Sequence, residues 1–142
     1  MTKVIFYVLS STTEQEKLIF VCKLLEKIYL KQLCCYVLTD NIEQSKNLDN
    51  LLWTFRPSSF VPHQLFMGEK FNSLDKILIG TDLPPEGWQE TIVNLSSHCP
   101  ENTLQTTKIL EIVNNNTASK ERGRQHYRQY QQFGLSIKTH QI

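Results

Sequence analysis

The sequence predicts an α/β fold with a mostly parallel sheet, and two observations support this fold class. Short apolar runs alternate along the chain with segments in which apolar residues recur at helical spacing. The first run, residues 4–9, is apolar throughout, which is typical of a strand covered on both faces. At 142 residues the chain is long enough for one domain, spanning residues 1–142, with its own core.

The first helix is expected directly after this strand. Thr13, with Glu16 three residues later, has the pattern of a capping box at a helix N-terminus. Six core candidates then follow at helical spacing, namely Leu18, Val21, Cys22, Leu25, Ile28 and Tyr29. The apolar residues 33–38 predict the second strand.

A second helix is expected to begin at a cap residue, Asp40 or Asn41. Its apolar stripe consists of Leu48, Leu51, Leu52 and Phe55. Pro57 ends this helix, because proline lacks the amide hydrogen that the next turn requires.

Three further strand candidates bring the expected total to about five, at residues 77–79, 92–93 and 109–113. Residues 114–117 then supply cap residues for a final helix, which reaches about Phe133. Gly134 is suited to end it, because glycine readily adopts the left-handed conformation found after helices.

Composition narrows the classes of function. The formal net charge is +1, so charge alone gives no reason to expect non-specific binding of nucleic acid. The four cysteines match neither a CxxC pair nor a zinc pattern, and we expect reduced thiols in a cytoplasmic protein. No apolar run approaches the length of a membrane span, and the first residues lack a signal peptide pattern.

Motifs for catalysis are missing from the sequence. The turn after the first strand, residues 10–13, reads Ser-Ser-Thr-Thr and has no glycine for a dinucleotide site. Ser10 and Ser11 could hydrogen-bond a ligand there, although helix capping explains them more simply. His98 and Cys99 are adjacent and would point to opposite sides of an extended segment. We therefore expect no catalytic residues, no metal and no cofactor.

The final helix offers a surface for binding a peptide. Lys120, Arg124 and Arg128 are spaced to form one row, with Tyr127 beside Arg124 and Val113 at the end of the preceding strand. Cations beside an apolar wall suit an acidic peptide that also carries an aromatic ring. The competing interpretation is an ordinary solvated helix face with tyrosines in the core.

A second surface is suggested by four aromatic residues close together in the sequence, Trp53, Phe55, Phe60 and Phe66. Trp53 lies about 100° around the helix from Leu52, so it need not point into the core. An exposed Trp and Phe would anchor a protein interface, and the spacing leaves core and interface equally open. His63 is most simply a hydrogen-bonded loop residue.

These residues also carry a resemblance to a known family. The shared pattern comprises Phe6-Tyr7, Leu48-Asp49, Leu52-Trp53, residues 59–63 (Ser-Phe-Val-Pro-His), and then Arg124, Tyr127, Arg128, Tyr130 and Gly134. Across nearly its whole length, the chain resembles the chi subunit family of bacterial DNA polymerase III, a component of the clamp-loader assembly. The block from Leu-Trp to Phe-Val-Pro-His is the most specific part.

The resemblance implies a three-layer α/β/α fold and a non-catalytic adaptor in DNA replication. Its partners would be the psi subunit and the acidic, Phe-ending C-terminal tail of single-stranded DNA-binding protein (SSB), so DNA would be engaged only indirectly. By position, the resemblance implies that Trp53 and Phe60 face psi. The tail site would consist of Val113, Lys120, Arg124, Tyr127 and Arg128.

Two departures and two alternatives accompany this interpretation. His126 stands where the family often has a basic residue, and a neutral imidazole there would reduce the positive charge. The segment of residues 70–74 is short and lacks the longer loop expected of some relatives, and residues 138–142 carry no readable signal. The alternatives are a small phosphate- or nucleotide-binding α/β enzyme and a direct binder of single-stranded DNA.

Overall fold

A computed structural model describes residues 2–56, 61–68, 75–100 and 105–142. The described residues form seven strands and three helices. In chain order they are β1 (Lys3–Val8), α1 (Glu14–Leu30), β2 (Cys35–Leu38), α2 (Ile42–Thr54), β3 (His63–Phe66), β4 (Ile77–Gly80), β5 (Thr91–Asn94), β6 (Lys108–Val113), α3 (Thr117–Gln132) and β7 (Ser136–Gln141).

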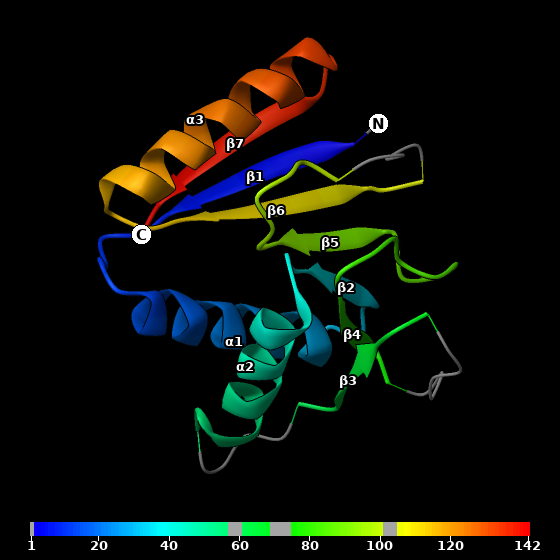
Figure 1. The fold of residues 1–142 in the computed structure, drawn as a ribbon. Coiled ribbons are helices and arrows are strands. Elements are labelled where there is room, and N and C mark those ends of the chain that lie inside the picture. Colours follow the sequence, from blue (N-terminus) through cyan, green and yellow to red (C-terminus); the bar gives the residue numbers. More distant parts are fainter. Residues whose placement is uncertain (1, 57–60, 69–74, 101–104) are drawn as a thin grey trace.

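The strands form one sheet in the order β3-β4-β2-β5-β6-β1-β7, and every pairing is parallel (Figure 1). The predicted α/β class is therefore confirmed, but the predicted count of about five strands was two too low. The two missed strands, β3 and β7, are the edges of the sheet. Residues 138–141, part of the segment for which the sequence carried no readable signal, belong to β7.

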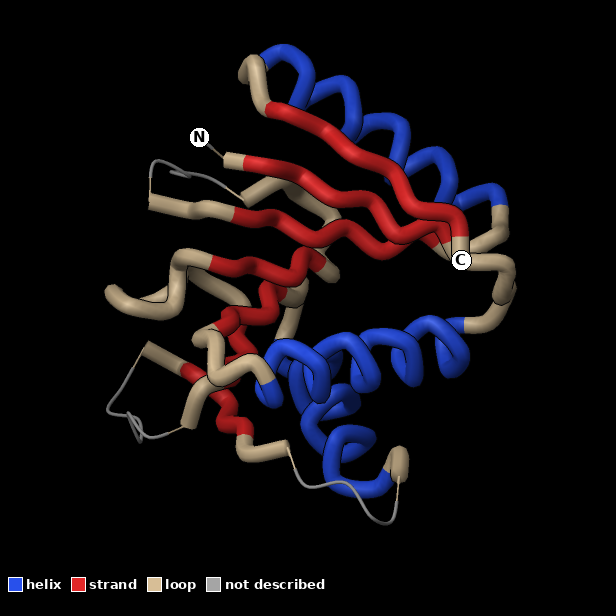
Figure 2. Tube along the Cα trace, turned by 180° about the vertical axis from the view of Figure 1, so that it is seen from behind, coloured by secondary structure: helices blue, strands red, loops and turns tan. Residues whose placement is uncertain are grey.

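The sheet is covered on both faces, as the three-layer prediction requires (Figure 2). On one face α1 and α2 pack on a core that includes Val21, Leu25 and Leu48, none of which is exposed. On the other face α3 packs on a smaller cluster that includes Val4 and Tyr130. Burial of this apolar surface is the main force that holds the three layers together.

The predicted N-caps and the predicted end of α3 are confirmed by their hydrogen bonds, whereas Pro57, predicted to end the second helix, lies outside the described residues. Thr13, Asn41 and Asn116 each accept an amide hydrogen from the first turn of α1, α2 and α3, respectively. Gly134 follows α3 with a φ angle of +74°, and the amide of Leu135 bonds back to the carbonyl oxygen of Tyr130. None of the described helices combines the length and apolar character needed to span a bilayer.

Candidate peptide-binding groove on the last helix

An open groove of about 550 Å³ lies beside α3 and brings together every residue of the predicted tail site. The five predicted residues along it are Val113, Lys120, Arg124, Tyr127 and Arg128. The remaining lining comes from Phe6 and Val8 of β1, Gly123 and Gln131 of α3, and Thr139 of β7. We call this the α3 groove.

The positive side of the α3 groove follows from helix geometry. Lys120, Arg124 and Arg128 are spaced at four residues and so lie on one side of α3, where all three are exposed. Arg124 forms an ion pair of 3.3 Å with Glu121, but both side chains are more than half exposed. Such a pair contributes little to stability, and the guanidinium group can exchange this partner for a ligand carboxylate.

The apolar side of the groove is built from two strands and one helix. Phe6 of β1 and Val113 of β6 are buried, whereas Tyr127 is 37% exposed. The rings of Phe6 and Tyr127 have centroids 5.6 Å apart and are tilted by 47°. A ligand ring could therefore contact Tyr127 while carboxylates of the same ligand reach the cations of α3.

Gly123 permits the close approach of α3 to the sheet. A Cβ atom at this position would lie 3.0 Å from Cγ2 of Val113, closer than such atoms normally approach. The missing side chain lets α3 sit directly on Val113, at the floor of the groove. No local pattern in the sequence singles out this glycine.

Beneath α3, buried polar contacts join the helix to β6. His126 is 2% exposed, and its Nδ1 lies 3.1 Å from Oε1 of Glu111. Its Nε2 lies 3.0 Å from the carbonyl oxygen of Ser97. The hydroxyl of Tyr130 donates to Oε2 of Glu111 at 2.5 Å, and Nδ2 of Asn94 donates to the same oxygen at 2.8 Å. The carboxylate of Glu111 therefore accepts hydrogen bonds from three donors.

The imidazole of His126, which stands where the family often has a basic residue, is buried and so does not lie in the exposed cationic row. Burial lowers the pKa of His126, but the hydrogen bond and charge of Glu111 and the Ser97 carbonyl oxygen outweigh burial and raise it above its ordinary value. His126 is a structural residue that anchors α3.

The second predicted surface, which consists of Trp53 and Phe60, lies only partly within the residues that the structure describes. Trp53 at the end of α2 is 49% exposed, and its ring centroid lies 4.5 Å from that of His63. It lines an open groove of about 670 Å³ between α1 and α2, together with Leu18 and Leu51. Phe60, the other residue assigned to this surface, lies outside the described residues.

His63 is not a loop residue, because it begins β3 and is buried. Its Nδ1 lies 2.6 Å from the carbonyl oxygen of Val61, and its Nε2 lies 2.9 Å from Oδ1 of Asp49. The hydrogen bonding predicted for this histidine is confirmed. These contacts fix the ring on which Trp53 packs.

Comparison with known proteins adds the identity of the family. The profile described as "DNA polymerase III chi subunit, HolC" matches residues 1–138. The chain belongs to the DNA polymerase III chi subunit family. A curated relative from Pseudomonas aeruginosa, "DNA polymerase III subunit chi", is 27% identical over all of this chain and 98% of its own length. Another of the same name, from Haemophilus influenzae, is 25% identical over 96% of this chain and 95% of its own length.

As a chi subunit, the chain is a non-catalytic accessory subunit of the polymerase III holoenzyme and acts in DNA replication. The alternative of a phosphate- or nucleotide-processing enzyme is thereby set aside. Among the described residues of this chi subunit, no three His, Cys, Asp or Glu side chains are grouped so that they could hold a metal ion. The sequence expectation about cofactors stays a prediction.

Three strand residues of the groove in this chi subunit escaped the site prediction, as did Gly123 and Gln131 of α3. Phe6 was noted only as part of the family pattern, and Val8 and Thr139 were not considered. Phe6 and Thr139 are register partners in β1 and β7, far apart in sequence. Only the pairing of these strands brings them under α3.

Proposed function

We propose that this chi subunit binds the acidic, Phe-ending C-terminal tail of SSB in the α3 groove. The observation that carries the proposal is the combination of a cationic row and an apolar wall in one groove. Lys120, Arg124 and Arg128 form charge-assisted hydrogen bonds with the tail carboxylates. The terminal Phe ring packs against Tyr127 and Val113, where burial of its apolar surface is favourable.

Calorimetric titration with a peptide of the SSB tail tests this proposal. We expect Lys120→Ala and Arg124→Ala each to weaken binding by roughly tenfold or more, since charge-assisted contacts are typically worth about 1.5–3 kcal/mol. Binding should also weaken as salt rises, because exposed ion pairs are screened. Arg56→Ala is the matched control, because Arg56 is a cation paired with Glu26 outside the α3 groove. Unchanged affinity in the Lys120/Arg124 double variant would exclude the α3 groove as the tail site.

We further propose that the psi subunit docks on the face of α2 that carries Trp53, with Phe60 as a second anchor. The exposure of Trp53 and its position in the α1–α2 groove support this surface as an interface. Half-exposed tryptophans that pack on a fixed neighbour are typical anchors of protein interfaces. The tail and psi sites then lie on different helices, so one chi subunit can bind both partners.

A further inference from the structure

A cavity of about 480 Å³ on the sheet carries no assigned role. Its lining includes residues of β2 and residues that follow β2, β4 and β5, where open α/β sheets commonly bind ligands. Its volume falls within the range of about 300–1,000 Å³ that is typical of small-molecule sites. None of its described lining residues lines the α3 groove or the α1–α2 groove. The cavity is therefore separate from both proposed protein-binding surfaces.

The cavity lies on the same face of the sheet as α3. Side chains of register partners point to the same face, and Tyr36, Ile92 and Ile109 are successive partners in β2, β5 and β6. Ile109 belongs to the cluster under α3, so the cavity residues Tyr36 and Ile92 face that side as well. On this face α3 packs on β6 and β7, whereas the residues over β2 come from the loops after β4 and β5. Loops rather than a helix therefore shape the cavity.

These loops leave apolar side chains of the cavity accessible. Leu38 lies on an inner strand, between β4 and β5, yet it is only half-buried, whereas Val37 beside it is fully buried. Leu83, in the loop after β4, is 57% exposed, and Pro84 is half-buried. Apolar residues of inner parallel strands are normally covered on both faces. The wall formed by Leu38, Leu83 and Pro84 therefore has apolar surface that a ligand can remove from water.

Two exposed carboxylates belong to the same lining. Asp40 follows β2 and Asp82 follows β4, each two residues beyond the last register pair of these neighbouring strands. Oδ1 of Asp40 accepts from the amide and the hydroxyl of Ser97 at 2.8 and 2.9 Å. Oδ1 of Asp82 accepts from the amide of Leu83 at 2.8 Å. The second oxygen of each carboxylate accepts no hydrogen bond from a described residue, so both are open to a ligand.

The charge of the cavity selects the class of ligand. No lysine or arginine is among the described residues that line it. An anionic ligand would therefore face Asp40 and Asp82 without a compensating cation, which is unfavourable. A wholly apolar ligand would cover the wall but would give the two carboxylates no partner. A cation with an apolar body satisfies both parts of the cavity.

We propose that this cavity binds a small organic cation, in which an ammonium or guanidinium group is joined to an apolar ring or chain. The charged group donates hydrogen bonds to the second oxygens of Asp40 and Asp82. The apolar body lies against Leu38, Leu83 and Pro84, where its burial is favourable. The site is independent of both the tail site and the psi site, because it shares no described residue with either groove.

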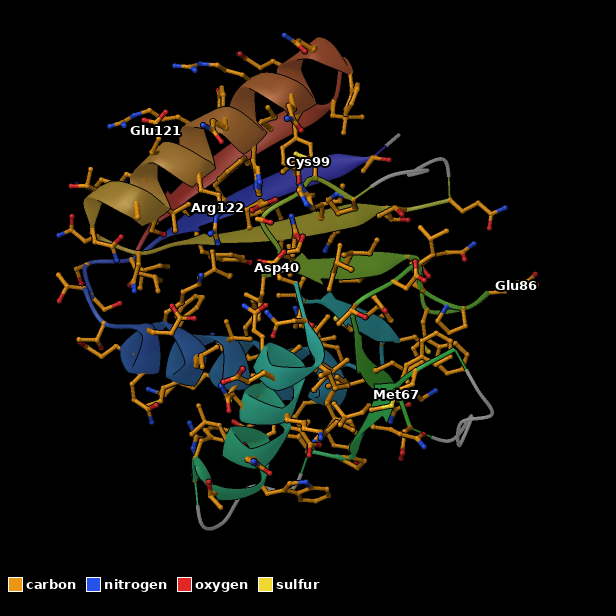
Figure 3. All side chains as sticks on the ribbon, in the orientation of Figure 1. Asp40, Met67, Glu86, Cys99, Glu121 and Arg122 are labelled. Carbon is orange, nitrogen blue, oxygen red and sulfur yellow. The ribbon has the colours of Figure 1, made fainter. Side chains whose placement is uncertain are left out.

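Calorimetric titration with tryptamine tests this site, and indolepropionate is the matched ligand, because it joins the same ring to an anion. We expect saturable binding of tryptamine, with indolepropionate weaker by about tenfold or more. Asp40→Asn and Asp82→Asn should each weaken tryptamine binding by about threefold or more, because each removes a charge. Glu86→Gln is the control variant, since this exposed acid lies at the tip of the loop after β4, away from Asp40 (Figure 3). It should bind tryptamine within about twofold of wild type.

Three results would each overturn the proposal: no saturable binding of tryptamine, equal affinity for tryptamine and indolepropionate, or wild-type affinity for tryptamine in the Asp40→Asn/Asp82→Asn double variant. Both substitutions should preserve the fold, because asparagine keeps the oxygen that accepts from Ser97 or from the amide of Leu83. The double variant should also keep wild-type affinity for the SSB tail peptide, which separates failure of this site from failure of the α3 groove.

Discussion

His126 joins the α3 groove to the interior of the protein through its contacts with Glu111 and Ser97. The imidazole is more easily protonated in the folded protein than in the unfolded chain, because its pKa is raised. Its contribution to the free energy of unfolding is therefore fully present below its ordinary pKa of 6.5 and is lost as pH rises through the raised value.

We accordingly predict that His126→Gln destabilises the protein most at acidic pH. The difference from wild type in the free energy of unfolding, measured with urea, should shrink as pH rises above 6.5. The exposed His140 supplies the control, since His140→Gln removes an imidazole outside this network. A wild-type His126 that titrates below 6.5 by NMR would contradict the assigned ion pair.

Trp53 and Leu52 are adjacent in α2 but have opposite environments, at 49% and 1% exposed. We predict that Trp53→Ala costs less than about 1 kcal/mol of stability and abolishes binding to psi. Leu52→Ala should instead cost about 2–5 kcal/mol, because it leaves a cavity in the core. Thermal unfolding and a psi pull-down measure the two effects. An equally large loss of stability in both variants would place Trp53 in the core.

At the scale of elements, the helices and the five inner strands were predictable because their own residues carry the signal. Runs such as residues 77–79 are buried on both faces and are therefore apolar throughout. The edge strands lack this pattern. β3 has four residues, of which only His63 is buried, and in β7 every residue other than Ile137 is exposed.

The α3 groove was predictable to the extent that it depends on one helix. Spacing by four residues places side chains on one side of a helix, so the row of Lys120, Arg124 and Arg128 can be found without knowledge of the fold. Phe6 and Thr139 enter the groove through the parallel pairing of β1 and β7, which no local pattern encodes. The burial of His126 of α3 depends likewise on a residue of another element, Glu111 of β6.

The close contact between α3 and β6 gives a test at this scale. Gly123→Val would force methyl groups against Val113, so we predict a loss of about 1–3 kcal/mol in stability and weaker binding of the tail peptide. Gln125→Val is the control, since Gln125 is an exposed position on the same helix. Urea unfolding and calorimetry report the two effects. Equal behaviour of the two variants would show that α3 does not need this close approach.

At the scale of the whole molecule, the class of partner depends more on where the charges lie than on the net charge. The net charge is only +1, yet three cations gather along the α3 groove. Weak attraction for bare DNA is expected from so small a net charge, because affinity for the phosphate backbone depends on the number of cations engaged. A groove that combines cations and an apolar wall instead favours a specific peptide.

The most direct test of the adaptor account compares three targets by fluorescence anisotropy near physiological salt. They are a labelled single-stranded oligonucleotide alone, the same oligonucleotide coated with SSB, and one coated with SSB that lacks its last residues. We predict that the chi subunit binds only the second target, and that Arg124→Ala weakens this binding. Sub-micromolar binding to the bare oligonucleotide that is lost on mutation of Arg124 or Arg128 would contradict the account and identify a direct DNA-binding protein.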